Sequence, residues 1–331
     1  MSLTTFESEA ASSPPNGPAG EAGNASDVAV SIRGLRKSYD RVEAVQGIDL
    51  DVPPGELFGF LGPNGAGKST TIKILCTLVR PTAGHATVAG HDVVAERDEV
   101  RRHIGLVFQE PTVDDYLTAE QNLRFHAEIY GLSRAVAGER IPAVLDLVGL
   151  ADERRRPVRT FSGGMKRRLE IARGLMHSPR VLFLDEPTIG LDPESRSTLW
   201  TYVDELRRRE RITIFLTTHY MDEAERCDRI AIVDQGRIVA LDAPAALKAT
   251  VGEDRVVVTT TDDAAAAALI RDRLGAPASC DGSGVTVLAA DGAQFVPRLF
   301  GLGIEVHSVT VSRPTLDDVF LAYTGNRMGD R

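Results

Sequence analysis

The chain has 331 residues, of which 43% are hydrophobic and 26% are charged, and its formal net charge is -9. This length predicts about two domains, and the apolar fraction is too high for a wholly disordered chain. The acidic balance argues against nucleic-acid binding, which needs a basic surface. No run of about 18 apolar residues occurs, so no segment is predicted to span a membrane.

The cysteines and histidines argue against disulfide frameworks and metal clusters. Cys76, Cys227 and Cys280 are far apart in the sequence and form no CxxC pair. They predict buried or idle thiols in a reducing compartment. The seven histidines lack HxxxH spacing, so no histidine metal site is predicted.

The first 27 residues differ in composition from the rest of the chain. They are rich in Ser, Pro, Gly, Ala and Glu, and Leu3 and Phe6 are their sizeable apolar residues. No apolar region follows a basic start, so a secretory signal is not predicted. We interpret 1–27 as a disordered tail, for which a docking role stays open.

Regular patterning begins at Val28. Residues 28–32 and 47–52 alternate apolar with polar side chains, as half-buried strands do. Apolar runs typical of strands covered on both faces follow at 57–61, 104–108, 181–184 and 212–216. Helical stretches lie between the strands, among them 71–78, 118–131, 139–148 and 166–175. Strands that alternate with helices predict a parallel, doubly wound α/β sheet, and residues 228–242 predict a hairpin.

After about residue 248 the pattern changes. Asp262 and Asp263 are expected to cap an alanine-rich helix at 264–274. Strands are expected at 255–260 and 304–311, two more within 278–288 around Asp281 and Gly282, and helices at 294–302 and 316–323. The order βαββαβ plus a helix predicts a small ferredoxin-like α+β domain over 254–325.

A glycine-rich loop directly follows the strand at 57–61. It fits GxxxxGK[ST] with Gly62, Pro63, Asn64, Gly65, Ala66, Gly67, Lys68 and Ser69, and Thr70 follows. Bare backbone lets N–H groups converge on phosphate oxygens, and the next helix adds partial positive charge at its N-terminus. The motif predicts that Lys68 reaches the β- and γ-phosphates, that Ser69 ligates Mg²⁺ and that Thr70 contacts the α-phosphate.

Two acids end the apolar strand at 181–184. Asp185 is expected to hold Mg²⁺ through water, and Glu186 to accept a proton from the attacking water or to polarise it. Acids often follow apolar strands, so this motif gains its meaning from the phosphate loop. Together the two motifs predict a P-loop nucleotide hydrolase.

A third motif, at 161–165, precedes a helix. Ser162, Gly163 and Gly164 combine a hydroxyl, bare backbone and a helix N-terminus, which predicts a second anion site. The motif resembles the LSGGQ signature of ATP-binding cassette (ABC) proteins, with Phe161 for Leu and Met165 for Gln. The resemblance implies that two copies of the chain sandwich two ATP molecules, each signature facing the phosphate loop of the other copy.

Further residues are similar to conserved positions of that family. Gln109 resembles the Q-loop glutamine, which touches Mg²⁺ or the attacking water and senses the transporter partner. His219 resembles the switch histidine, which contacts the γ-phosphate, and residues 190–192 resemble the D-loop. Tyr39 resembles the aromatic that stacks on adenine, although a lone tyrosine near a strand end can equally be a packing residue.

The strand pattern supports a common location for these motifs. Gly62, Gln109, Asp185 and His219 each lie just beyond the carboxyl end of an apolar strand. Ligands bind at that edge of an open parallel sheet. We therefore expect the motifs to meet at one edge.

The resemblance covers 28–247 as an ABC domain with a helical insert at 111–173. Residues 314–321, with Thr324 and Gly325, look like the C-terminal extension of the daunorubicin-resistance ATP-binding subunit family. This implies the ATPase subunit of an ABC-2 type drug or antibiotic exporter, using ATP and Mg²⁺. It also implies a homodimer bound to a separate integral-membrane permease at the cytoplasmic face of the membrane.

Other classes remain as alternatives. A DNA-repair or chromosome-organising cassette would carry long coiled-coil or zinc inserts, and a ribosome-associated factor would carry two cassettes. A non-transport P-loop kinase is disfavoured by the motif at 161–165. Export, rather than import, rests on the C-terminal resemblance, and the sequence does not reveal the cargo.

Overall fold

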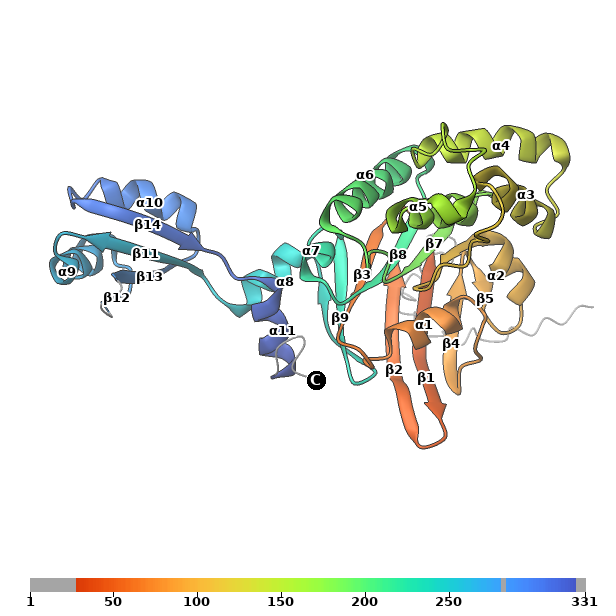
Figure 1. The fold of residues 1–331 in the computed structure, drawn as a ribbon. Helices are drawn as coiled ribbons and strands as arrows, with labels where there is room; N and C mark the ends of the chain where they lie inside the picture. The colour runs from red at the N-terminus through yellow and green to blue at the C-terminus, as the bar shows by residue number, and fades with distance from the viewer. Residues whose placement is uncertain (1–27, 281–283, 326–331) are drawn as a thin grey trace, which may run out of the picture.

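The computed structural model describes residues 28–280 and 284–325 (Figure 1). The predicted disordered tail at 1–27 and the turn residues Asp281 and Gly282 lie outside these ranges. Figure 1 shows a larger part up to α8 (Pro244–Val251), with a small sheet and its helices extending beyond that helix.

The larger part is built on a mostly parallel sheet with strand order β10-β9-β3-β8-β7-β6. Its strands are β3 (Leu57–Leu61), β6 (Ile104–Val107), β7 (Val181–Asp185), β8 (Thr213–Thr218), β9 (Arg229–Asp234) and β10 (Arg237–Asp242). β10 pairs antiparallel with β9, as the hairpin pattern predicted. Every residue of β3, β7 and β8 is buried, which confirms that these apolar runs are covered on both faces.

An antiparallel sheet of order β2-β1-β4-β5 lies beside it. Its strands are β1 (Val30–Tyr39), β2 (Val42–Val52), β4 (Ala83–Val88) and β5 (His91–Asp92). Ile32, Leu50 and Val88 share a core cluster with Phe60 of β3 and Ile72 of α1 (Lys68–Leu75), so this cluster joins the two sheets. The sequence analysis did not predict β4 and β5.

Helices enclose a second core cluster on the other side of the parallel sheet. They are α3 (Ala119–Ile129), α4 (Arg134–Leu147), α5 (Gly163–Gly174), α6 (Pro193–Glu210) and the short α7 (Met221–Ala224). The short α2 (Arg97–His103) contributes Val100 to the first cluster. Thr118, Ser133, Ser162 and Asp192 cap the four long helices with side-chain oxygens. Helices α3 and α4 occupy the interval expected for the helical insert.

The C-terminal elements follow the predicted order βαββαβ plus a helix. They are β11 (Asp254–Thr260), α9 (Asp263–Leu274), β12 (Ala278–Cys280), β13 (Val285–Ala289), α10 (Gly292–Phe300), β14 (Val306–Ser312) and α11 (Leu316–Thr324). The strands pair antiparallel in the order β12-β13-β11-β14, and α9 and α10 pack into one cluster with them. Helix α11 then returns to pack beside α8.

The buried face of α11 belongs to the larger part. Leu316, Val319 and Phe320 share its core cluster with Leu247 of α8. The sequence analysis had grouped this helix with the C-terminal domain. In the described ranges, no helix combines the length and apolar character needed to cross a bilayer.

Candidate functional site

Parallel pairing brings the predicted motifs to one edge of the central sheet. Leu61, which ends β3, pairs with Thr218 of β8, and Asp185 of β7 pairs with Thr217. The phosphate loop follows Leu61, and His219 follows Thr218. The loop, the acidic pair and His219 therefore meet, as expected for a ligand site at the carboxyl ends of parallel strands.

The glycines of the loop are required by close backbone approaches. A Cβ at Gly62 would lie 2.3 Å from the carbonyl oxygen of Val233, and one at Gly67 would lie 2.4 Å from that of Ala44. Gly67 also has φ of 101°, a left-handed conformation that favours glycine, and it caps α1. Neighbouring strands thus hold the loop directly before the N-terminus of α1, where backbone N–H groups can bind phosphate.

Lys68 is buried at the centre of the site. Its Nζ donates to the carbonyl oxygens of Gly62 and Pro63, at 2.7 and 3.1 Å. The same ammonium lies 3.3 Å from Oε1 of Glu186. Burial lowers the pKa of Lys68, and the negative charge of Glu186 opposes that shift. The ammonium is therefore held between the backbone of the phosphate loop and the carboxylate of Glu186.

Ser69 and Asp185 form an oxygen-rich pair beside it. Ser69 Oγ donates to Asp185 Oδ1 at 3.2 Å, and Thr217 Oγ1 donates to the same oxygen at 2.6 Å. Hydroxyl and carboxylate oxygens are the donors that Mg²⁺ prefers. This donor set fits the predicted metal.

Glu186 stands between two cationic or polarisable groups. Its Oε1 faces Lys68, and its Oε2 lies 3.3 Å from Nδ1 of His219. The His219 contact lacks hydrogen-bond alignment, so it is a proximity rather than a hydrogen bond. Glu186 has φ of 47°, and its backbone N–H donates to the backbone and side-chain oxygens of Thr217. These bonds hold a strained residue in place, as is common at functional sites.

The second anion motif begins α5. Ser162 Oγ accepts a hydrogen bond from the N–H of Met165 at 3.2 Å, while Ser162 and Gly163 are exposed. A Cβ at Gly164 would lie 2.7 Å from Oγ of Ser195 in α6, so this glycine permits close packing. The helix N-terminus is therefore presented to the outside of the chain.

Gln109 and Tyr39 are both exposed and lie at or just beyond the ends of their strands. Gln109 follows β6 by two residues and its side chain is exposed. Tyr39 ends β1 with 43% of its surface exposed, and Lys37 Nζ lies 4.9 Å from its ring centroid. The stacking role of Tyr39 and the metal role of Gln109 stay predictions.

Arg167 is a site residue that the sequence analysis missed. This buried side chain of α5 donates to the backbone oxygens of Asp185, Glu186 and Pro187 at 3.1, 3.3 and 2.7 Å. It also donates to the Phe108 carbonyl, directly before Gln109, and pairs with buried Glu170. One guanidinium therefore fixes the backbone of the acidic motif and the start of the Gln109 loop.

Glu223 is a second missed residue. Its carboxylate is 1% exposed and accepts hydrogen bonds from Thr188 and from Thr218, the latter at 2.6 Å. It thus connects the loop after Glu186 to the end of β8, directly before His219. No local pattern in the sequence distinguishes it from an ordinary helical glutamate.

Comparison with known proteins identifies the class. A family model described as ABC transporter matches residues 45–189. The daunorubicin/doxorubicin resistance ATP-binding protein DrrA of Streptomyces peucetius is 43% identical over 92% of this chain and 94% of its own length. The linearmycin resistance ATP-binding protein LnrL of Bacillus subtilis is 37% identical over 89% of this chain and 98% of its own length.

Solved structures agree. The cbiO1 protein of Clostridium perfringens, described as part of the ABC transporter complex cbiONQ, has a TM-score of 0.64 and 27% identity, covering 75% of this chain and 96% of its own. An ATP-binding cassette solved as a post-hydrolysis dimer with ADP and Pi has a TM-score of 0.59 and 26% identity. The match covers 65% of this chain and 98% of that cassette.

The chain therefore belongs to the ATP-binding subunits of ABC transporters, which are ATPases. Within that family, its near-full-length relatives are the ATP-binding proteins of drug and antibiotic resistance exporters. This confirms the family resemblance found in the sequence.

Proposed function

We propose that this chain hydrolyses ATP to drive a separate integral-membrane permease that exports a drug or antibiotic. The observation that carries the proposal is the convergence of Lys68, Glu186 and His219 with the Ser69–Asp185 pair at one sheet edge. The names of the relatives favour export over the DNA-repair and ribosome-associated alternatives.

The phosphate loop supplies the nucleotide contacts. Backbone N–H groups of the non-proline residues in 62–70 and the Lys68 ammonium bind the phosphates, and Tyr39 stacks on adenine. Ser69, Asp185 and Gln109 would hold Mg²⁺, which neutralises charge on the phosphate oxygens. The short Ser69–Asp185 separation supports the first two of these ligands.

Hydrolysis requires a base beside the γ-phosphate. Glu186 accepts a proton from the attacking water or orients it, and His219 contacts the γ-phosphate. The position of the Glu186 carboxylate between Lys68 and His219 supports this division of roles.

The second anion site completes the pocket of another copy. Ser162, Gly163 and Gly164 face the phosphate loop of a second chain, so that two copies enclose two ATP molecules. Their exposure at the N-terminus of α5 supports this, as does the dimeric cassette among the structural relatives. The homodimer attaches to the permease at the cytoplasmic face of the membrane.

The proposal is tested with Glu186→Gln. ATP hydrolysis is expected to fall at least about 100-fold, since general bases contribute about 10²–10⁴, while ATP binding persists and dimers accumulate. Glu139→Gln, at an exposed position of α4, is the matched control and should hydrolyse ATP normally. Unchanged turnover of Glu186→Gln would refute the assignment of the base.

The transport role has a separate test. The full chain should co-purify with a multi-span membrane protein, and deleting its gene should sensitise the host to at least one exported compound. Co-purification with ribosomes or DNA instead would contradict the export proposal.

A further inference from the structure

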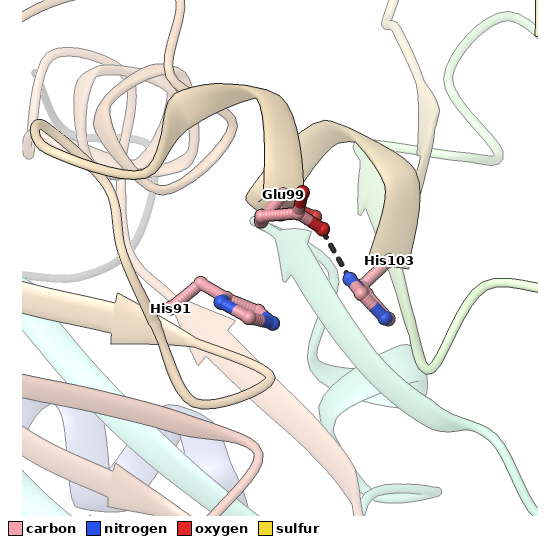
Figure 2. A group of neighbouring side chains, drawn as sticks. All are labelled: His91, Glu99 and His103. Carbon is pink, nitrogen blue, oxygen red and sulfur yellow. Dashed lines mark hydrogen bonds between the residues drawn. The ribbon is translucent and has the colours of Figure 1, made fainter.

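A cluster of metal-ligating side chains lies away from the nucleotide site. His91 belongs to β5, and Glu99 and His103 lie one turn apart on α2 (Figure 2). One ligand atom from each of the three lies within 4.8 Å of the others. HxxxH spacing could not reveal this group, because one histidine comes from a strand and the other from the following helix.

A hydrogen-bond acceptor lies beside Nδ1 of each imidazole. His103 Nδ1 lies 2.8 Å from the Glu99 carbonyl oxygen, and His91 Nδ1 lies 3.2 Å from Oε1 of Glu96. With Nδ1–H donating to these acceptors, Nε2 of each ring keeps its lone pair. Metal-binding histidines are held in this way by a carbonyl or carboxylate on the other ring nitrogen. The rings stack with centroids 5.0 Å apart.

The carboxylate of Glu99 is available at the same place. Its side chain is 41% exposed and pairs with Arg102, whose side chain is 67% exposed. Exposed pairs of this kind contribute only about 0–1 kcal/mol, so a metal can displace the guanidinium. The negative charge of neighbouring Glu96 further favours a cation.

We propose that His91, Glu99 and His103 bind one divalent transition-metal ion, best represented by Zn²⁺. Two imidazole nitrogens and one carboxylate oxygen form a donor set typical of Zn²⁺, whereas Mg²⁺ prefers oxygen ligands. Bonds of about 2.0–2.2 Å require the side chains to move closer together on binding. Their partial exposure leaves room for that movement.

The bound ion would join two parts of the fold. β5 is an edge strand of the antiparallel sheet, and His103 directly precedes β6 of the central sheet. A metal at this position would therefore crosslink the edge strand β5 to helix α2. This role is independent of the proposed nucleotide chemistry.

The experiment is a Zn²⁺ titration of the nucleotide-free full chain in excess Mg²⁺, with Co²⁺ absorption as a spectroscopic probe of nitrogen ligands. We expect one high-affinity ion per chain and a higher melting temperature with Zn²⁺. His91→Gln and His103→Gln should each weaken binding at least about tenfold, as loss of even supporting groups does. His85→Gln is the control, since His85 is a largely exposed neighbour outside the cluster.

Circular dichroism and metal-free melting establish that each variant is folded. Glu99→Gln, on an exposed helix face, gives a second variant that should fold and still lose affinity. The proposal is overturned if wild type binds no stoichiometric Zn²⁺. It is equally overturned if folded His91→Gln, His103→Gln and Glu99→Gln all bind Zn²⁺ as wild type does.

Discussion

At the scale of single residues, Arg167 and Glu186 show what a sequence motif can and cannot reveal. Glu186 was predictable because an acid after an apolar strand and a phosphate loop has a defined chemical task. Arg167 was not, because an arginine in a polar helix usually faces solvent. Its guanidinium instead donates to four carbonyl oxygens that are distant in sequence and to the Glu170 carboxylate.

Replacing Arg167 with Met should destabilise the chain by about 3–5 kcal/mol, because it removes the guanidinium 3.1 Å from buried Glu170 and leaves that carboxylate with Arg173 at 3.8 Å. Urea denaturation measures the loss. Arg155→Met, at an exposed position, should change stability little. Arg167→Lys should recover only part of the loss, since an ammonium cannot make the forked contacts. A stable Arg167→Met variant with normal ATPase activity would contradict this role.

At the scale of elements, strands buried on both faces were the easiest to predict. β3 and most of β7 are apolar runs, and β8 contains the apolar Ile214, Phe215 and Leu216, so their structure follows the sequence closely. β4 and β5 were missed because most of their residues are at least partly exposed and the strands lack a clear alternation. The position of α11 was also unpredictable, because its partner α8 precedes the whole C-terminal sheet.

The docking of α11 leads to a prediction for Phe320. Phe320→Ala should cost about 3–5 kcal/mol of local stability, the range for a buried phenylalanine. Hydrogen exchange should then be faster in α11 than in β3. Phe300→Ala is the matched control, because Phe300 is 56% exposed on α10. Equal protection of α11 in both variants would show that the helix does not depend on this contact.

The start of α3 leads to a prediction about pH. Arg154 contacts both carboxylate oxygens of Glu120 at 2.7 Å, and this pairing holds the pKa of Glu120 at about 2, below its ordinary 4.5. A lowered carboxyl pKa stabilises the fold above pH 4.5, and the contribution is lost as the pH falls from 4.5 toward 2.

Glu120→Gln should therefore lower the free energy of unfolding near neutral pH by about 1 kcal/mol or less, the range for partly exposed pairs. The difference in the free energy of unfolding between wild type and Glu120→Gln should become smaller as the pH falls below 4.5. Denaturant midpoints at several pH values measure this. Glu139→Gln on α4 is the control, and its free energy of unfolding should equal that of wild type at each pH. If the difference in the free energy of unfolding became larger at acid pH, the prediction that the Glu120–Arg154 pair loses its stabilising effect there would be wrong.

At the scale of the whole molecule, the two predicted anion sites differ in how far one chain encloses them. The phosphate loop is held between neighbouring strands and contacts Lys68, whereas the N-terminus of α5 is exposed. Both could be proposed from the sequence, because each is a short local motif, and both stay predictions. How two copies face each other depends on a second chain, so it follows from the proposed function and requires its own test.

That test mixes two inactive variants. Lys68→Ala damages the phosphate loop, and Gly163→Asp places a carboxylate at the exposed helix end, where a Cβ would meet its nearest neighbour at 3.6 Å and so fits. Each variant alone should be inactive. A mixed dimer pairs the intact loop of one chain with the intact α5 of the other, so ATPase activity should return to roughly a quarter of wild type, since half of the dimers are mixed and each has one sound site. Lys68→Ala mixed with Glu186→Gln should stay inactive, because both changes damage the loop side. If the first mixture also stays inactive while mixed dimers form, each copy must complete its own pocket.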